Sequence, residues 1–78
     1  MQELKTGAIY RHYKDKLYKV LGVVRHSETL EELVLYEALY HNPSSKLWVR
    51  PKAMFLEDVT VGEYQGPRFR LEESKWMK

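Results

Sequence analysis

The sequence predicts a small, mainly β domain, and three observations support this prediction. Short runs of aromatic and β-branched residues recur along the chain, and such residues favour strands. Polar or Gly- and Pro-containing breaks separate these runs at intervals suited to tight turns. A length of 78 residues is enough for one domain, which we assign to residues 1–71, with residues 72–78 as a C-terminal tail.

The first two predicted strands form a hairpin. Residues 8–13, AIYRHY, are rich in strand-forming side chains, and the polar residues 14–16, KDK, have the length of a hairpin turn. Residues 17–24, LYKVLGVV, are apolar on both faces, which predicts a central strand. Gly22 inside this strand indicates a bulge or a sharp bend, the usual device for curling a small sheet.

Residues 32–40 are compatible with a helix and with a strand. Thr29 and Glu32 match a capping box, and the segment contains good helix formers. A helix here would however be apolar all around, and it would leave residues 46–50 without a pairing partner. The sequence therefore favours a strand over residues 32–40, joined to a second strand by a turn at residues 41–45.

The charges and apolar groups of this second hairpin predict its register. Pairing Tyr40 with Leu47 places Glu37 opposite Arg50, an ion pair worth about 0.2–1 kcal/mol. A slip by one residue would bury Glu37 and move every side chain to the other face. We therefore expect Trp48 and Arg50 on the more exposed face. The expected core layer consists of Val34, Tyr36, Ala38, Tyr40, Leu47 and Val49.

The rest of the chain predicts one helical turn and two further strands. Pro51 suits the first position of a helical turn over residues 51–54, because that position needs no backbone N–H. Residues 55–61 and 68–71 are predicted strands, the second at a sheet edge, with a turn at residues 62–67 between them. About five short strands with tight turns and one helical turn are typical of a small, partly open SH3-like barrel or roll.

Composition restricts the class of protein without selecting a function. The chain carries 13 basic and 11 acidic side chains in mixed order, so a nucleic-acid role is allowed but not implied. There is no cysteine, which excludes disulfides and thiolate metal sites and fits a reducing compartment. The sequence starts without signal-peptide features, and no apolar run approaches the ~20 residues that span a bilayer. We expect a soluble, cytoplasmic protein without membrane contacts.

Several stretches of the sequence, taken in order, resemble a known family. They are Tyr10-Arg11-His12-Tyr13, Tyr18-Lys19-Val20-Leu21-Gly22, Arg25-His26-Ser27-Glu28-Thr29, Leu47-Trp48-Val49-Arg50-Pro51 and Met54-Phe55-Leu56-Glu57. Over about residues 7–69 the chain resembles the domain of unknown function 1653 family, whose members are small, mostly bacterial proteins with an SH3-like barrel or roll. The resemblance implies a strand over residues 32–40. It implies no activity, because none is known for the family.

The loop after the central strand contains the first candidate site residues. Arg25, His26, Ser27 and Glu28 include the hydroxyl, base and carboxylate of a catalytic triad. Triads are assembled from distant segments, however, and four adjacent residues seldom point at one atom. We favour a polar loop in which Ser27 and Thr29 bond backbone groups. In that loop Arg25 pairs with Glu28, or Arg25 and His26 donate to a bound phosphate or carboxylate.

The spacing of the histidines does not support a metal site. His12, His26 and His41 could surround an ion together with Glu28, but the chain has neither an H-x-x-x-H pair nor a cysteine pair. We predict no metal and no cofactor.

Aromatic and basic side chains are interleaved in two further places, at residues 10–13 and at Trp48 and Arg50. Such patterns stack on bases, hold carboxylates or dock extended peptides, although in a small domain the same rings can simply form the core. We expect Trp48 to give stacking area and Arg50 to donate to an anionic group. The full set of candidate ligand-binding residues is Arg25, His26, Glu28, Trp48, Arg50, Arg11 and His12.

The sequence thus favours a binding module over an enzyme. Its partner would be anionic or extended, such as a peptide, a nucleic-acid segment or a small metabolite. One alternative is a small hydrolase or isomerase that uses His26 and Glu28 as acid and base. Another is a structural domain whose Trp48 face is covered by a second copy. We expect a monomer or a weak homodimer.

Overall fold

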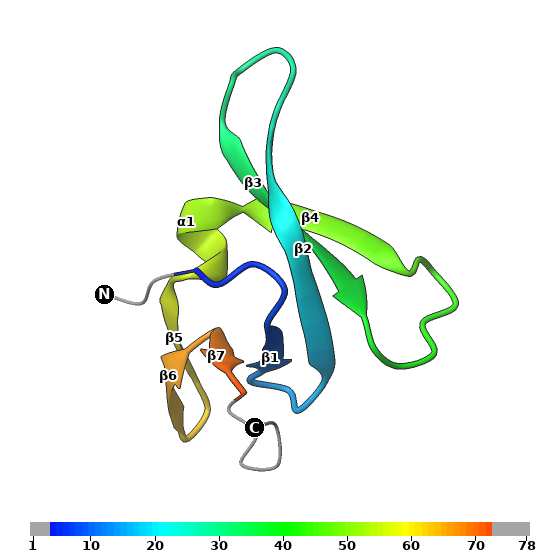
Figure 1. Cartoon of the computed structure of the whole chain (residues 1–78). Coiled ribbons are helices and arrows are strands. Elements are labelled where there is room, and N and C mark those ends of the chain that lie inside the picture. The colour runs from blue at the N-terminus through cyan, green and yellow to red at the C-terminus, as the bar shows by residue number, and fades with distance from the viewer. Residues whose placement is uncertain (1–3, 73–78) are drawn as a thin grey trace.

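A computed structural model describes residues 4–72, which form seven strands and one short helix (Figure 1). The elements are β1 (Ile9–His12), β2 (Leu17–Arg25), β3 (Glu32–Ala38), β4 (Leu47–Pro51), α1 (Lys52–Phe55), β5 (Asp58–Val61), β6 (Tyr64–Pro67) and β7 (Phe69–Leu71). An open five-stranded antiparallel sheet has the order β4-β3-β2-β1-β7, and β5 pairs separately with β6. The predicted mainly β fold is confirmed, with seven strands where about five were expected.

The first hairpin forms as the sequence predicts. β1 pairs with β2, and the chain turns between them with Asp15 at a φ of 72°. β2 lies between β1 and β3, which confirms that this strand is central. The register between β2 and β3 shifts between Val20 and Gly22, so the bulge predicted from this glycine is present.

β3 confirms the prediction of a strand, but the predicted register of its hairpin with β4 is wrong. Glu37 lies opposite Leu47 and not opposite Arg50, a shift of three residues along β4 (50 − 47). Because the shift is odd, the side chains of β4 face the side opposite to the predicted one. Trp48 and Arg50 therefore share the face of Tyr36 and the core.

The connection between β3 and β4 explains this register. The loop covers residues 39–46, and Tyr40 folds back so that its hydroxyl lies 2.5 Å from the hydroxyl of Tyr18. The indole of Trp48 packs against the core and donates from Nε1 to the carbonyl oxygen of Ser45 at 3.1 Å.

The opposite face of this hairpin carries two residues that the sequence assigned to the core. Leu47 and Val49 are 51% and 53% exposed. The half-buried indole of Trp48, with its N–H bonded, thus packs against the core in place of these two smaller aliphatic side chains. Glu37 pairs with Lys46, with 3.2 Å between Oε2 and Nζ, in place of the expected pair with Arg50.

The C-terminal part contains more strand than the sequence predicts. Pro51 precedes α1, so the helical turn is confirmed, one residue later than expected. Phe55 belongs to α1 and not to the following strand. The segment 62–67, predicted as a turn, turns only at its first two residues and then forms β6. β7 is the predicted edge strand, and of the predicted tail only Glu72 lies within the described residues.

The core lies on one side of the five-stranded sheet, which we call the inner face. Its buried side chains are Tyr10, Val20, Val34, Tyr36, Phe55 and Phe69. α1 lies against this side near β3 and β4 (Figure 1). The rings of Phe55 and Phe69 stack with their centroids 4.0 Å apart, so the core is built largely from aromatic packing. No helix within residues 4–72 is long and apolar enough to cross a membrane.

Candidate functional site

Three predicted site residues lie at the projecting end of the β2–β3 hairpin (Figure 1). Arg25 donates from Nη1 to the carbonyl oxygen of Leu30 at 3.0 Å and does not pair with Glu28. Nδ1 of His26 accepts the backbone N–H groups of Glu28 and Thr29 at 3.1 and 3.3 Å. These bonds fit the interpretation of a polar loop held together by side chain to backbone bonds.

Arg11 is engaged in ion pairs on the outer face of β1. Its side chain pairs with Asp15 and with Glu72, where Nε and Oε1 lie 2.9 Å apart and Nη2 and Oε2 lie 3.2 Å apart. The hydrogen bond from Arg11 lowers the pKa of the Glu72 carboxyl. This forked contact links β1 to the residue that follows β7. Arg11 therefore stabilises the fold and lies on the opposite side of the sheet from the other candidate site residues of β1 and β4.

The structure brings His12, Trp48 and Arg50 onto the inner face. The ring of His12 lies 4.8 Å from that of Phe69, centroid to centroid. The guanidinium of Arg50 lies over the same phenyl ring at 5.5 Å and donates from Nε to the hydroxyl of Tyr36 at 3.2 Å. Trp48 stands opposite Tyr36 on β4. Phe69, from the last strand of the chain, is therefore the residue that joins His12 to Arg50.

Half-buried rings continue this cluster to the surface. Tyr64 stacks on Tyr13 at 5.7 Å, Tyr13 contacts His12 at 4.4 Å, and His12 contacts Tyr18 at 6.4 Å. Tyr18 then meets Tyr40 at 5.4 Å. We call the half-buried side chains of His12, Tyr13, Tyr18, Tyr40, Trp48 and Tyr64 the aromatic rim.

The charges around the aromatic rim are positive. The ammonium groups of Lys16 and Lys14 lie 5.0 Å from the Tyr40 centroid and 6.0 Å from the Tyr13 centroid. Within residues 4–72, no carboxylate lies within ion-pair distance of Arg50, Lys14 or Lys16. Arg68 does pair with a carboxylate, that of Glu57 at 3.4 Å. The rim thus lies beside cations that no carboxylate of the described residues pairs with.

The pKa of His12 reflects its burial and these neighbouring cations. Burial, followed by the positive charges of Arg50, Arg68 and Lys14, lowers its pKa from 6.5 to about 4. The imidazole is therefore neutral at neutral pH. Three cations, Arg50, Arg68 and Lys14, thus act on the ring of His12 and disfavour its protonated form.

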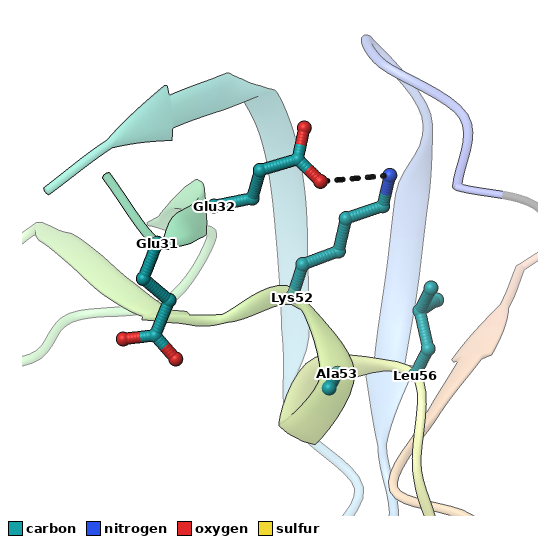
Figure 2. A pocket seen from close by; sticks show the side chains of 5 residues that line it. All are labelled: Glu31, Glu32, Lys52, Ala53 and Leu56. Atoms are coloured by element: carbon teal, nitrogen blue, oxygen red, sulfur yellow. Dashed lines mark ion pairs between the residues drawn. The ribbon is translucent and has the colours of Figure 1, made fainter. Parts of the chain in front are cut away.

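A second, shallower feature lies beside α1. Glu31, Glu32, Lys52, Ala53 and Leu56 line a depression there (Figure 2). Lys52 pairs with Glu32 across it at 3.7 Å, and the carboxylate of Glu31 points away from this pair. Two carboxylates and one ammonium group line this depression, so it does not favour an anion. Among residues 4–72, no three His, Asp or Glu side chains come together as metal ligands.

Sequence reasoning missed half of the aromatic rim. His12 and Trp48 were named as candidates and Tyr13 was recognised as part of an interleaved pattern, but Tyr18, Tyr40 and Tyr64 were not. Alternation in the first hairpin places His12 on the side of Tyr10 and Tyr18, which could have identified two members. The contribution of β7 depends on its pairing with β1, where Phe69 lies opposite His12, and no local pattern reveals that pairing.

The fold and the site define a class: a small, open, mainly β domain with aromatic and unpaired basic side chains on the exposed margin of its core. The chain belongs to a family of proteins of unknown function, DUF1653, whose model matches residues 8–71. It is similar to the crystal structure of a DUF1653 protein from Bordetella bronchiseptica, with a TM-score of 0.80 and 37% sequence identity. The match covers 90% of this chain and 88% of that one. No match was found among the curated proteins.

The predicted family is therefore confirmed. Its description names no activity, ligand or partner, so any function must be argued from the residues of this chain.

Proposed function

We propose that this domain is a binding module that recognises an anionic group through the aromatic rim. The observation that supports this proposal is the state of Arg50. Its guanidinium is half-buried over Phe69, yet no carboxylate within residues 4–72 neutralises it. Apart from the hydroxyl of Tyr36, the acceptor near it is the sulfur of Met54 at 3.8 Å from Nη1, a weak one.

A cation in this position favours an external anion. Partial burial removes part of the hydration of the guanidinium, and the protein returns one good hydrogen bond. A carboxylate or phosphate would accept the remaining N–H groups through the planar fork of Arg50. Lys14 and Lys16 would add long-range attraction, because neither has an acidic partner among the described residues.

The rings extend the proposed contact beyond the charge. Trp48 and the tyrosines of the rim are half-buried, so each offers part of its ring to solvent. Partly exposed aromatic faces stack on flat groups and pack against extended chains. This combination favours a small flat ligand, a peptide or a short nucleic-acid segment with an anionic group near a ring or backbone.

Backbone pairing is a less favoured way of binding. β4 is an edge strand, but the hydroxyl of Ser45 donates to the carbonyl oxygen of Leu47 at 2.7 Å and accepts the N–H of Leu47 at 3.2 Å. Pro51, at the other end of β4, has no N–H. The edge therefore offers few free groups to an added strand, which supports a face-binding domain that is monomeric or weakly dimeric.

We also assign the fold to the SH3-like class and the protein to the cytoplasm. The edge strands β4 and β7 approach one another across the inner face through Arg50 and Phe69, and α1 precedes β5. A strongly curled sheet with one helical turn is the arrangement expected of such a partly open barrel. The lack of cysteine is consistent with a reducing compartment.

Catalysis by His26 and Glu28 has no comparable support. Nδ1 of His26 holds two backbone N–H groups of its own loop, which leaves a single ring nitrogen for chemistry. The backbone N–H of Glu28 donates to that imidazole, and the described residues show no carboxylate contact with it.

The proposal is tested by NMR titration of the ¹⁵N-labelled protein with benzoate, phenyl phosphate, an acidic hexapeptide and oligothymidylate. We expect saturable amide shifts around residues 12–18 and 48–50. Arg50→Gln should weaken binding about 10- to 100-fold, the equivalent of a lost charge-assisted contact of roughly 1.5–3 kcal/mol. A steep loss of affinity with salt would identify nucleic acid as the preferred partner.

Arg25→Gln is the matched control, because it removes an arginine of the same sheet at the other candidate position. It should leave binding unchanged. Shifts confined to residues 25–28 and abolished by Arg25→Gln would instead place the site in the β2–β3 loop and overturn the proposal. The absence of shifts with every probe would overturn it as well.

A further inference from the structure

We propose that the anionic group held by the aromatic rim is a phosphate monoester dianion on a ring-bearing molecule. This inference rests on the proposed function and narrows its ligand to one chemical class. It follows from an imbalance in hydrogen bonding: around the rim the described residues supply several donors without acceptors. A ligand that completes such a site must be rich in acceptor oxygens.

The first donor is Nε2 of His12. Nδ1 of the same ring accepts the backbone N–H of Lys14 at 3.1 Å. A neutral imidazole that accepts at one nitrogen carries its proton on the other, so Nε2 is an N–H donor. Within residues 4–72 this N–H has no partner, and the atom is not sealed from solvent. It is therefore available to a ligand.

The second donor comes from the hydroxyl pair of Tyr18 and Tyr40. The two oxygens share one hydrogen bond of 2.5 Å, and Tyr40 also accepts from Nδ2 of Asn42 at 3.2 Å. Two hydroxyl groups bring two protons, and the bond between them uses one. Whichever tyrosine donates, the other keeps a proton without an acceptor among the described residues. The pair presents one O–H donor in either orientation.

Arg50 supplies the remaining donors. It uses Nε for the hydroxyl of Tyr36 and has only the weak sulfur contact of Met54 at Nη1. The Nε of Arg68 also has no hydrogen-bond partner within residues 4–72, but it is buried and is therefore not counted among the donors that a ligand can reach.

The charge count favours a dianion over a monoanion. Arg50, Lys14 and Lys16 have no acidic partner among the described residues, and Glu57 compensates only Arg68. A carboxylate would neutralise one of these charges with two oxygens in one plane. A phosphate monoester carries about −1.5 to −2 at pH 7 and has three tetrahedral oxygens. Such a group can accept from donors on different strands, here His12 on β1 and Arg50 on β4, which both contact the ring of Phe69.

The rings of the rim explain why the phosphate should be attached to a flat group. Tyr13, Tyr40 and Trp48 are half-buried beside the donors, and a ring carried next to the phosphate would stack on one of them. Inorganic phosphate has no ring, so it would make the polar contacts but would not stack on the aromatic rim.

Three phenyl-based probes separate charge from geometry at pH 7.5. Phenyl phosphate is a tetrahedral dianion, methyl phenyl phosphate a tetrahedral monoanion, and benzoate a planar monoanion. We expect phenyl phosphate to bind at least tenfold more tightly than either of the others, and more tightly than inorganic phosphate, by NMR titration of the rim amides. The ³¹P resonance of bound phenyl phosphate should shift.

Two variants connect this preference to its donors. His12→Phe keeps a ring and removes the Nε2 donor, so the advantage of phenyl phosphate over benzoate should fall severalfold. Arg50→Lys keeps the charge and removes the fork, so all three probes should weaken. Lys5→Gln, which removes an exposed cation outside the aromatic rim, should change nothing.

The outcomes distinguish this inference from the proposed function. Equal or tighter binding of benzoate, lost in Arg50→Gln, would overturn the phosphate assignment and leave the rim as a carboxylate site. Equal binding of the two phosphate probes would overturn the requirement for a dianion. Absence of rim shifts with every anion would overturn both proposals.

Discussion

The guanidinium of Arg50 lies 5.5 Å from the ring centroid of Phe69. The two residues belong to β4 and β7, the opposite edges of the five-stranded sheet, which are not joined by backbone hydrogen bonds. Because Phe55 stacks on one face of the Phe69 ring, the guanidinium takes the other face. One cation–π contact thus bridges the gap that leaves the sheet open, and the same cation is the centre of the proposed anion site.

Arg50→Met tests the structural part of this contact. Methionine retains most of the apolar stem and removes the charge and the bond to the Tyr36 hydroxyl. We expect the free energy of unfolding to fall by about 1–2 kcal/mol, measured by urea denaturation at pH 7. That is a large share of the roughly 4–12 kcal/mol expected of a domain of this size.

Arg25→Met provides the control for this measurement, since the guanidinium of Arg25 bonds a loop carbonyl and contacts no ring within residues 4–72. A loss in Arg25→Met equal to that in Arg50→Met would show that the contact with Phe69 contributes nothing specific.

The strands could be predicted from the sequence because the residue patterns that indicate them are local. Aromatic and β-branched runs identified β1 to β4, and Gly22 identified the bulge in β2. The register of β4 was not accessible, because Leu47 and Val49 alternate with Trp48 and Arg50 and both faces look suitable for a core. In the structure the indole of Trp48 packs against the core, and the predicted register, in error by three residues, placed Trp48 and Arg50 on the wrong side.

The site was only partly predictable for a related reason. His12, Trp48 and Arg50 were named from local aromatic and basic patterns, and the structure places all three on the inner face. Their connection runs through Phe69, which pairs with His12 from the far end of the chain. Loop residues such as His26 attracted attention by their chemistry, but their hydrogen bonds serve the loop itself.

His12 should make stability depend on pH. Its pKa is about 4 in the folded protein and has an ordinary value of 6.5, so the unfolded chain binds more protons between these values. Stability from this residue is complete above pH 6.5 and is lost as the pH falls toward 4. After allowance for solvent screening we expect about 1–2 kcal/mol, obtained from urea denaturation as the difference between the protein and His12→Gln.

The ring resonances of His12 provide the direct test. They should titrate well below pH 5.5 in NMR spectra of the folded protein. Titration near 6.5, or identical pH dependence of stability in His12→Gln, would contradict the effect of burial and of the neighbouring cations.

Substitution by alanine should destabilise the protein at Gly66 and have little effect at Gly22. A Cβ on Gly66 would lie 3.0 Å from the hydroxyl oxygen of Tyr64, which donates to the carbonyl oxygen of Pro67 at 2.7 Å. Gly66→Ala should therefore break this bond and cost about 1–3 kcal/mol of unfolding free energy. A Cβ on Gly22 meets no atom within 4 Å, so Gly22→Ala should change stability by less than about 1 kcal/mol.

Thermal or urea unfolding measures both variants under one condition. Because Tyr64 stacks on Tyr13, the amide shifts of Gly66→Ala should extend into the aromatic rim. Equal stability of the two variants would show that the Tyr64 hydroxyl moves aside without cost.

The hydroxyl of Ser45 should keep the β4 edge closed. It donates to the carbonyl oxygen of Leu47 and accepts the N–H of the same residue, at 2.7 and 3.2 Å. Ser45→Ala frees both backbone groups on an edge strand whose Leu47 and Val49 side chains are already about half exposed. A free apolar edge favours strand pairing between molecules. We expect concentration-dependent dimers or larger species of Ser45→Ala in sedimentation velocity, under conditions where the unsubstituted protein does not associate further.

Ser44→Ala is the control for this last prediction. The backbone N–H of Ser44 donates to the side chain of Asn42, and its hydroxyl bonds no group within residues 4–72. Its sedimentation should match that of the unsubstituted protein. If Ser45→Ala also stays unchanged up to millimolar concentration, the proline at the end of β4 and the twist of the strand suffice to protect the edge, and the serine is not needed for it.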